Sequence, residues 1–461
     1  MTYITQMRNI LITCLFFTIS LSGLFAQNNK FPRLEADVQI KNFATSTDNA
    51  DWNALFDIAF WASTVDPVTA SNKITEESKS AYKEKIKNIV ETFDKELGTS
   101  EAKSQVEKAE YILKFLHKNI FTTYSLNQTR IDTLLTNGRF NCVSSAMMYV
   151  VLAKHIGLDP RGVITKDHAF VCLEIGGENI DIETTNAYGF DPGKRKDFHD
   201  DFGKTTGFAY TPPGNYRTRQ TITQIELCSI ILRNRIADLE KAQKYAEAVP
   251  LSIDRYELLK TRKNATVSLL FEDPAVELDN AIFNLQAFYL NKKRETDALA
   301  WADISANLIH DTKRLHEAEA AATNNLIVKS LRAGKISQAE SDLSQNEKRL
   351  SVDELKTLKG MILDASLTEL VNVSKNDEAT LNAIKQLDTA GQTGLVDKKR
   401  IEELKQTVTK NRIAYFHNTF ATYFNKKDFK GAGQILQQAT LEFPGNKLFE
   451  TDRKNLDKVQ S

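Results

Sequence analysis

Apolar side chains recur every three or four residues along four segments near the start of the chain, a spacing that predicts amphipathic helices. The predicted helices run from Asp51 to Phe60, Ser78 to Leu97, Glu107 to Ile120 and Cys142 to Ile156. Asn141 suits the N-cap of the last helix, and Gly157 suits its C-terminal end. Residues 27 to about 50 are polar and lack this period, so we predict an N-terminal tail there.

After residue 160 the pattern changes to that of short strands. The predicted strands run from Arg161 to Thr165, His168 to Ile175 and Asn179 to Thr184. Gly176 and Gly177 separate the last two strands and form a two-residue hairpin signal. Residues 186 to 222 are rich in Pro, Gly and Asp, which predicts a loop with little regular structure.

From Leu227 to its end the chain has a helical pattern with a recurring helix-turn-helix rhythm. The runs Tyr289-Leu-Asn-Lys-Lys and Tyr423-Phe-Asn-Lys-Lys are near copies, and an alanine follows each Tyr by nine residues, at Ala298 and Ala432. Ser330-Leu-Arg-Ala-Gly leads to Ala339 in the same way. A small residue packed between paired helices resembles tetratricopeptide-type repeats. The irregular spacing leaves a plain helical bundle as the alternative.

The start of the chain has the pattern of a secretory signal. Arg8 precedes an apolar run from Ile10 to Leu21, and a site suited to cleavage follows Ala26. We therefore expect residues 1–26 to be a signal peptide and the mature protein to be secreted or periplasmic. An uncleaved anchor is the alternative, but the run is shorter than the ~20 apolar residues of an ordinary span. We expect no integral membrane span after signal removal.

Charge and cysteine content narrow the function classes. Lys and Arg number 60, as do Asp and Glu, so the formal net charge is zero. This balance gives no electrostatic reason to expect nucleic acid as a partner. Cys14 would leave with the signal, and Cys142, Cys172 and Cys228 would stay. Because their number is odd, at least one thiol stays free or pairs between chains in an oxidising compartment.

Cys142 has a physical reason to be reactive. It follows a turn, in the run Gly138-Arg-Phe-Asn-Cys142, and opens a predicted helix. The unpaired N–H groups and positive partial charge of a helix N-terminus stabilise the thiolate. The same groups suit an oxyanion on a substrate carbonyl. His168 opens a strand 26 residues later and could take the thiol proton.

The hairpin register selects an acid that would orient His168. If the Gly176-Gly177 loop holds two residues, Glu183 lies diagonally beside His168, with Cα atoms roughly 7–8 Å apart. Asp181 shares that face but lies opposite Cys172, roughly 13 Å along the strand from His168. This register favours Glu183 over Asp181. A loop one residue longer or shorter would turn these side chains to the other face of the sheet. Glu183 and Asp181 therefore both remain candidates for the orienting acid.

Four motifs in this order resemble the transglutaminase-like superfamily of papain-type cysteine enzymes. They are Cys142, Gly157-Leu-Asp-Pro-Arg161, His168-Ala169-Phe170 and Glu183-Thr184-Thr185. The resemblance covers roughly residues 105 to 190. Two positions depart from the family pattern: Phe170 stands where Trp is usual, and Glu183-Thr-Thr stands where Asp-Pro-Thr is usual.

The resemblance implies an α+β transglutaminase-like (papain-like) core followed by an all-α, tetratricopeptide-like domain. The expected parts are a signal peptide (1–26), an N-terminal helical region (27–105), a transglutaminase-like domain (106–225) and a helical domain (226–461).

The resemblance also implies cysteine-dependent acyl transfer or hydrolysis at amide bonds of a peptide or protein. Cys142 would be the nucleophile, His168 the base and Glu183 the orienting acid. We expect no cofactor and no metal, and a possible protein partner on the helical C-terminal region. The alternative is a catalytically inactive scaffold whose helical region binds a protein.

Overall fold

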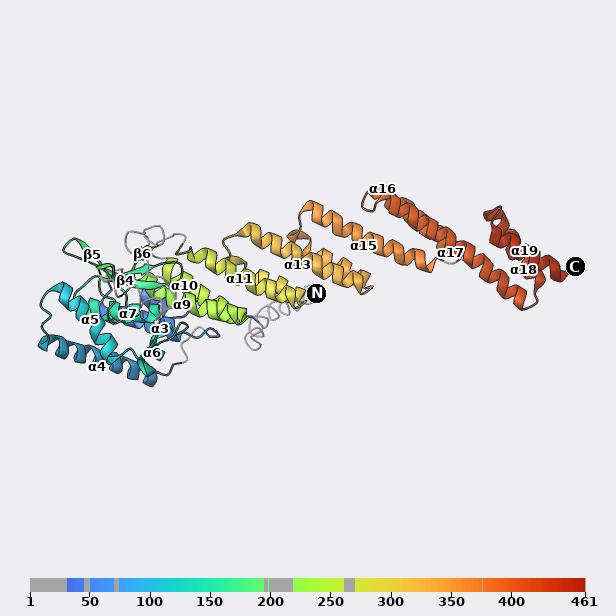
Figure 1. The fold of residues 1–461 in the computed structure, drawn as a ribbon. Coiled ribbons are helices and arrows are strands. Elements are labelled where there is room, and N and C mark those ends of the chain that lie inside the picture. The colour runs from blue at the N-terminus through green and yellow to red at the C-terminus, as the bar shows by residue number, and fades with distance from the viewer. Residues whose placement is uncertain are drawn as a thin grey trace, which may run out of the picture. The chain divides into compact units, whose positions relative to one another are not determined.

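The structure is a computed structural model that describes residues 31–44, 50–69, 74–194, 198, 219–260, 270–374 and 376–460 (Figure 1). The expected signal peptide, residues 1–26, lies outside the described residues, as does most of the loop expected between 186 and 222. Export therefore stays a prediction.

Helices α2 to α11 belong to the N-terminal part of the chain. They are α2 (Ile40–Ala44), α3 (Trp52–Thr64), α4 (Glu76–Thr99), α5 (Gln105–Asn119), α6 (Ile131–Asn137), α7 (Cys142–His155), α9 (Gln224–Lys241), α10 (Tyr245–Lys260) and α11 (Pro274–Asn291). The strands are β1 (Thr123–Tyr124), β2 (Arg139–Phe140), β3 (Arg161–Ile164), β4 (Ala169–Ile175), β5 (Glu178–Ile182) and β6 (Gln220–Ile222).

The remaining described chain is helical. Its α-helices are α12 (Glu295–Ser305), α13 (Thr312–Arg332), α14 (Ile336–Asn346), α15 (Val352–Val373), α16 (Asp377–Thr393), α17 (Lys398–Asn425), α18 (Phe429–Glu442) and α19 (Lys447–Gln460). Short 3₁₀ helices are η1 (Pro192–Lys194), η3 (Ala306–Leu308) and η4 (Glu347–Arg349).

The fold class expected from the sequence, an α+β papain-like core followed by a tetratricopeptide-like domain, is wrong. Helices account for 71% of the structure and strands for only 6%. The motifs that suggested an α+β core come from a short stretch of the chain. Most of the buried apolar side chains around that stretch belong to helices, among them α3, α5, α7 and α9. Helix packing, rather than sheet packing, therefore supplies most of the hydrophobic core.

The chain divides into two compact units. The first unit contains residues 1–291 and 303–312, and the second contains residues 292–302 and 313–461. The boundary expected after residue 225 lies inside the first unit. Leu227 and Ile231 on α9 are buried in the same core as Phe56 on α3 and Val150 on α7. A chain break there would expose this shared apolar surface, so α9 belongs to the first unit.

The small sheet of the first unit has the strand order β5-β4-β3-β6, with antiparallel neighbours throughout. Ile175 pairs with Glu178 and Val171 with Ile182, which confirms the register predicted from a two-residue Gly176-Gly177 loop. Strand β6 falls within the segment expected to be a loop and was not predicted. Three residues are too few for a recognisable alternation, and β6 exists because β3 offers it a pairing edge.

Helix α7 is the central helix of the first unit. Every residue from Cys142 to Ala153 is buried, and the helix contacts α3, α5, α9 and β4 (Figure 1). A helix that is apolar all round is stable only when neighbours cover all its faces. Burial of α7 therefore fixes the place of its N-terminal residue, Cys142, within the unit.

The second unit is built from successive helical hairpins. The turn residues Lys293, Gly334 and Lys427 have positive φ, and each precedes a fully buried alanine by five residues, at Ala298, Ala339 and Ala432. Gln243, between α9 and α10, and the buried Ala248 of α10 repeat this arrangement in the first unit. In each case a left-handed residue ends one helix, and a fully buried alanine lies in the first turns of the next helix.

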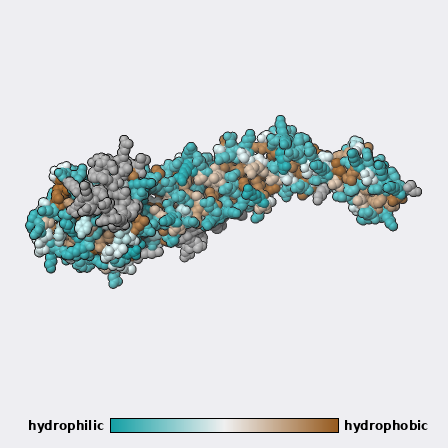
Figure 2. Space-filling model, viewed as in Figure 1, coloured by the Kyte–Doolittle hydropathy of each residue, from teal (hydrophilic) through white to brown (hydrophobic). Residues whose placement is uncertain are grey.

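The second unit has several small apolar cores instead of one large core. Separate clusters lie among α13, α14 and α15, among α15, α16 and α17, and among α17, α18 and α19. Hydrophilic residues cover most of the face seen in Figure 2. Within the described part of the chain, no helix has both the length and the apolar character needed to cross a bilayer.

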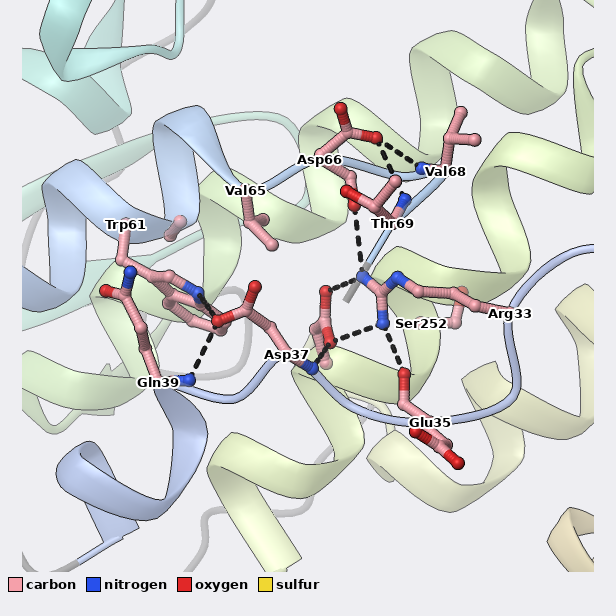
Figure 3. A network of polar contacts seen from close by, with 12 residues as sticks. Arg33, Glu35, Asp37, Gln39, Trp61, Val65, Asp66, Val68, Thr69 and Ser252 are labelled. Atoms are coloured by element: carbon pink, nitrogen blue, oxygen red, sulfur yellow. Dashed lines mark hydrogen bonds and ion pairs between the residues drawn. The ribbon is translucent and has the colours of Figure 1, made fainter. Parts of the chain in front are cut away.

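We expected an N-terminal tail over residues 27 to about 50. The described segment after residue 30 instead binds the core of the first unit. Arg33 donates to both carboxylate oxygens of Asp254 on α10, at 3.0 and 2.5 Å. The Asp37 N–H donates to Asp254 Oδ1 at 2.8 Å, and the Trp61 indole N–H donates to Asp37 Oδ1 at 3.0 Å (Figure 3). Asp254 is fully buried, so these donors replace the water that its charge has lost.

Candidate active site

The residues around the start of α7 hold Cys142 at a well-capped helix N-terminus. The Asn141 side chain accepts hydrogen bonds from the N–H groups of Val143 and Ser144, at 3.0 and 3.1 Å. The Ser144 hydroxyl in turn accepts from the Asn141 N–H at 3.0 Å, which completes a capping box. Asn141 is thus the N-cap predicted from the sequence, and Gly157 follows the helix with φ of 79°. Cys142 is a free thiol and is 8% exposed.

His168 lies immediately before β4 and contacts both other residues of the predicted site. Its Nε2 lies 2.7 Å from Oε2 of Glu183, and it lines the same cleft as Cys142, which helps to raise its pKa. Nε2 is thus the ring nitrogen that contacts the carboxylate of Glu183. The structure therefore brings Cys142, His168 and Glu183 together in the predicted order.

Glu183 is completely buried, and neighbouring residues fix its orientation. Its Oε1 accepts hydrogen bonds from the Thr185 N–H at 3.0 Å and the Thr185 hydroxyl at 2.6 Å. Oε2 is therefore the oxygen that faces His168. The Thr184 hydroxyl lies 2.8 Å from the Ser145 hydroxyl, which ties this segment to α7. The run Glu183-Thr184-Thr185 thus holds the acid and attaches it to the helix that carries the thiol.

Asp181, the alternative acid, has a different partner. Arg219 donates to both of its carboxylate oxygens, at 2.8 and 2.7 Å. The same guanidinium lies over the Phe170 ring, 4.9 Å from its centroid. Asp181 lies opposite Cys172 in the sheet, as the predicted register required. Of the two acids, Glu183 is therefore the one in contact with His168.

The charges around His168 favour its protonated form. Burial by itself lowers the pKa of His168, but the negative charge of Glu183 and side-chain hydrogen bonds to Cys142 and Glu183 outweigh burial and raise this pKa to about 10. An imidazolium beside a cysteine stabilises the thiolate. By contrast, burial and the charge of Asp181 raise the pKa of the Cys172 thiol to about 11.

His117 on α5 is a site neighbour that the sequence did not reveal. Its Nε2 lies 3.0 Å from the carbonyl oxygen of Thr184. Burial lowers the pKa of His117 more than this hydrogen bond and the charge of Glu183 raise it, so the neutral ring donates its Nε2 proton. This hydrogen bond of His117 therefore helps to hold the segment that carries Glu183 in place. In the sequence it is simply one position on a helical face, 66 residues before Glu183.

A cleft of about 310 Å³ opens beside Cys142 and His168. The opposite wall is the face of α9 that carries Ile230, Arg233, Asn234 and Asp238. The turn between β3 and β4 and the segment 126–129 also line the cleft. The nucleophile candidate thus lies at the edge of a space that a substrate chain could enter. Among the described residues, no group of three His, Cys, Asp or Glu side chains is arranged to hold a metal ion.

Comparisons with known proteins do not assign a family. No family model matches the chain, and no curated protein matches it. Among solved structures, it is similar to the crystal structure of menin that reveals the binding site for Mixed Lineage Leukemia (MLL) protein. The identity is 12%, the match covers 93% of this chain and 97% of that chain, and the TM-score is 0.32. This likeness carries no functional argument, and the resemblance to transglutaminase-like proteins stays a prediction.

Proposed function

We propose that this protein is a cysteine-dependent enzyme that cleaves or transfers acyl groups at amide bonds of a peptide or protein. Cys142 is the nucleophile, His168 carries the proton, and Glu183 orients His168. The observation that supports this proposal most is the buried His168–Glu183 contact, with His168 and Cys142 lining one open cleft. A structural histidine needs neither a thiol partner nor a neighbouring cleft.

The reaction begins with a proton already on His168. The Cys142 thiolate adds to the substrate carbonyl carbon, a C–S bond forms, and the carbonyl oxygen becomes an oxyanion. The C–N bond then breaks while the imidazolium of His168 gives its proton to the leaving nitrogen, which leaves a thioester. Neutral His168 next takes a proton from water or an amine as that group attacks. Release of the acyl group regenerates the thiolate and the imidazolium.

The cleft favours a polar, extended substrate. Asn127, Asn234 and Asp238 supply donors and acceptors along its walls, while Ile230 offers an apolar contact. Such a lining suits the alternating amide groups and side chains of a peptide. Whether the acyl group passes to water or to an amine depends on which nucleophile enters this cleft. Secretion and a protein partner on the second unit stay predictions that accompany the proposal.

Thiol reactivity tests the proposal. Purified protein is treated with iodoacetamide from acidic to alkaline pH, and each cysteine is mapped by mass spectrometry. Cys142 should already react at neutral pH, because the His168 imidazolium stabilises its thiolate. In His168→Ala the alkylation of Cys142 should shift to higher pH. Cys172 is the internal reference and should react only under alkaline conditions, since its pKa is raised to about 11.

His155→Ala is the matched control. His155 also contacts a carboxylate, with Nε2 2.8 Å from Asp94 Oδ1, but it lies at the other end of α7. Its loss should leave Cys142 alkylation unchanged. If Cys142 in the native protein reacts only like an ordinary or buried thiol, the enzyme proposal is wrong and an inactive scaffold is favoured.

A further inference from the structure

Backbone pairing holds Tyr124 close to the start of α7, the helix that Cys142 begins. Strand β1 runs parallel to β2 and places Tyr124 opposite Phe140, two residues before Cys142. The Ser125 N–H donates to the Phe140 carbonyl at 2.8 Å, which continues this pairing toward α7. The Phe140 ring meets the Tyr124 ring edge to face, with centroids 5.9 Å apart. The phenol is therefore held by both its backbone and its ring.

The hydroxyl of Tyr124 is buried, and among the described residues it has no hydrogen-bond partner. A buried polar group without a partner destabilises the folded state, so such groups are uncommon and call for an explanation. His117 and Ser145, two other polar side chains near the site, differ in this respect. Their polar atoms already contact Thr184.

The charges near Tyr124 keep its proton in place. Burial raises the pKa of the phenol, and the negative charges of Cys142 and Glu183 raise it further. At neutral pH the phenol is thus a hydrogen-bond donor close to the reacting sulfur. The sulfur also lies close enough to His168 to raise the pKa of the imidazole. The phenol can therefore donate its proton to a negative charge that develops on a substrate at this sulfur.

We propose that Tyr124 donates a hydrogen bond to the oxyanion formed when Cys142 adds to a substrate carbonyl. This inference rests on the proposed function. As the C–S bond forms, the π electrons of the carbonyl move onto its oxygen, and the O–H of Tyr124 gains its missing partner. When the oxyanion collapses, the carbonyl re-forms and the bond to the leaving group breaks. A donor that is satisfied only in the transition state lowers the barrier without tightening substrate binding.

Two reagents that attack the same sulfur separate this role from nucleophile activation. The sulfur displaces iodide from the saturated carbon of iodoacetamide, so this reaction forms no oxyanion. Para-nitrophenyl acetate acylates the thiolate through an oxyanion and releases nitrophenolate, which is followed by its absorbance. In Tyr124→Phe, acylation of Cys142 should slow roughly 100-fold, the usual effect of losing one oxyanion donor, while alkylation should keep its native rate and pH profile. The thermal midpoint should not fall, because the hydroxyl has no partner to lose.

Tyr111→Phe is the matched control, since the Tyr111 hydroxyl bonds Glu96 at 3.3 Å outside the cleft. It should change neither rate. Equal slowing of both reactions in Tyr124→Phe would mean that Tyr124 acts on the sulfur, and unchanged acylation would mean that it does not act at all. Either result overturns this inference while the enzyme proposal stands. If neither reagent modifies Cys142 of the native protein selectively, the enzyme proposal fails and this inference fails with it.

Discussion

At the residue scale, the protonation state of His168 depends on two neighbours from different parts of the fold. Glu183 follows β5, and Cys142 begins α7. Burial alone would make the ring neutral, because a low dielectric opposes charge. The nearby Glu183 carboxylate and the Cys142 side chain outweigh this effect of burial and raise the pKa of His168 to about 10. Thr185 contributes by holding Oε1 of Glu183, so that Oε2 is presented to the ring.

This raised pKa predicts how stability depends on pH. Folding favours the protonated ring, so its contribution is complete below the ordinary histidine pKa of about 6.5. The contribution declines as pH rises through the folded-state pKa of about 10. Urea unfolding of native protein and His168→Gln should therefore show the largest difference in unfolding free energy in mildly acidic solution. The difference should shrink steadily toward alkaline pH, and a difference that grows with pH would contradict the assignment.

At the scale of elements, the site depends on the turn that follows β5. The Glu183 N–H donates to the Gly189 carbonyl at 2.7 Å, and the Gly189 N–H donates to the Asn186 carbonyl at 3.0 Å. The turn therefore closes directly onto the backbone of Glu183. A Cβ atom at Gly189 would lie 2.1 Å from the Glu183 carbonyl oxygen, closer than any real contact allows. Only glycine permits this approach.

Gly189→Ala should displace Glu183 and loosen its contact with His168. We expect a loss of about 1–3 kcal/mol in unfolding free energy, the usual effect of an added carbon in a packed site. We also expect slower alkylation of Cys142 at neutral pH. Both are measured, by urea unfolding and by mass spectrometry. Gly193→Ala is the control, because a Cβ atom added at Gly193 would meet no other atom within 4 Å. Equal effects of the two substitutions would refute the role of the Gly189 contact.

At the scale of the whole molecule, the two units reach stability differently. The first unit has one large core, and residues distant in sequence complete it, as the pairing of Arg33 with Asp254 shows. The second unit has small cores between consecutive helices. The stability of a unit with several small cores depends on contacts between helices that are neighbours in the chain. In a unit with a single core, a change at one place affects the stability of the whole unit. A change in the buried ion pair should therefore affect the first unit as a whole.

Arg33→Ala leaves the buried carboxylate of Asp254 without its cation. Removing one partner of a buried pair destabilises by roughly 3–5 kcal/mol. Hydrogen exchange followed by mass spectrometry should show faster exchange throughout the first unit and unchanged exchange in the second. Lys83→Ala is the control, because Lys83 and Asp57 form a more exposed pair whose loss should have little effect. Unchanged protection in the first unit would show that the pair does not hold its N-terminal segment.

The sequence by itself determined the local features of this protein. It determined the start of the helix at Cys142, the Asn141 cap and the hairpin register that places Glu183 beside His168. These depend on side-chain periodicity, capping groups and turn residues, which act over a few positions in the chain. Three of the candidate site residues could therefore be named before the structure was known.

Only the tertiary structure decided the rest. It replaced the expected α+β class with a mainly helical one, moved the boundary between units, and bound the polar segment of Arg33 to a buried acid. It also placed Tyr124 and His117 beside the site. Each of these results depends on contacts between residues far apart in the chain. Such contacts produce no periodic pattern that can be recognised in a single sequence. Packing of whole elements, rather than local preference, selects them.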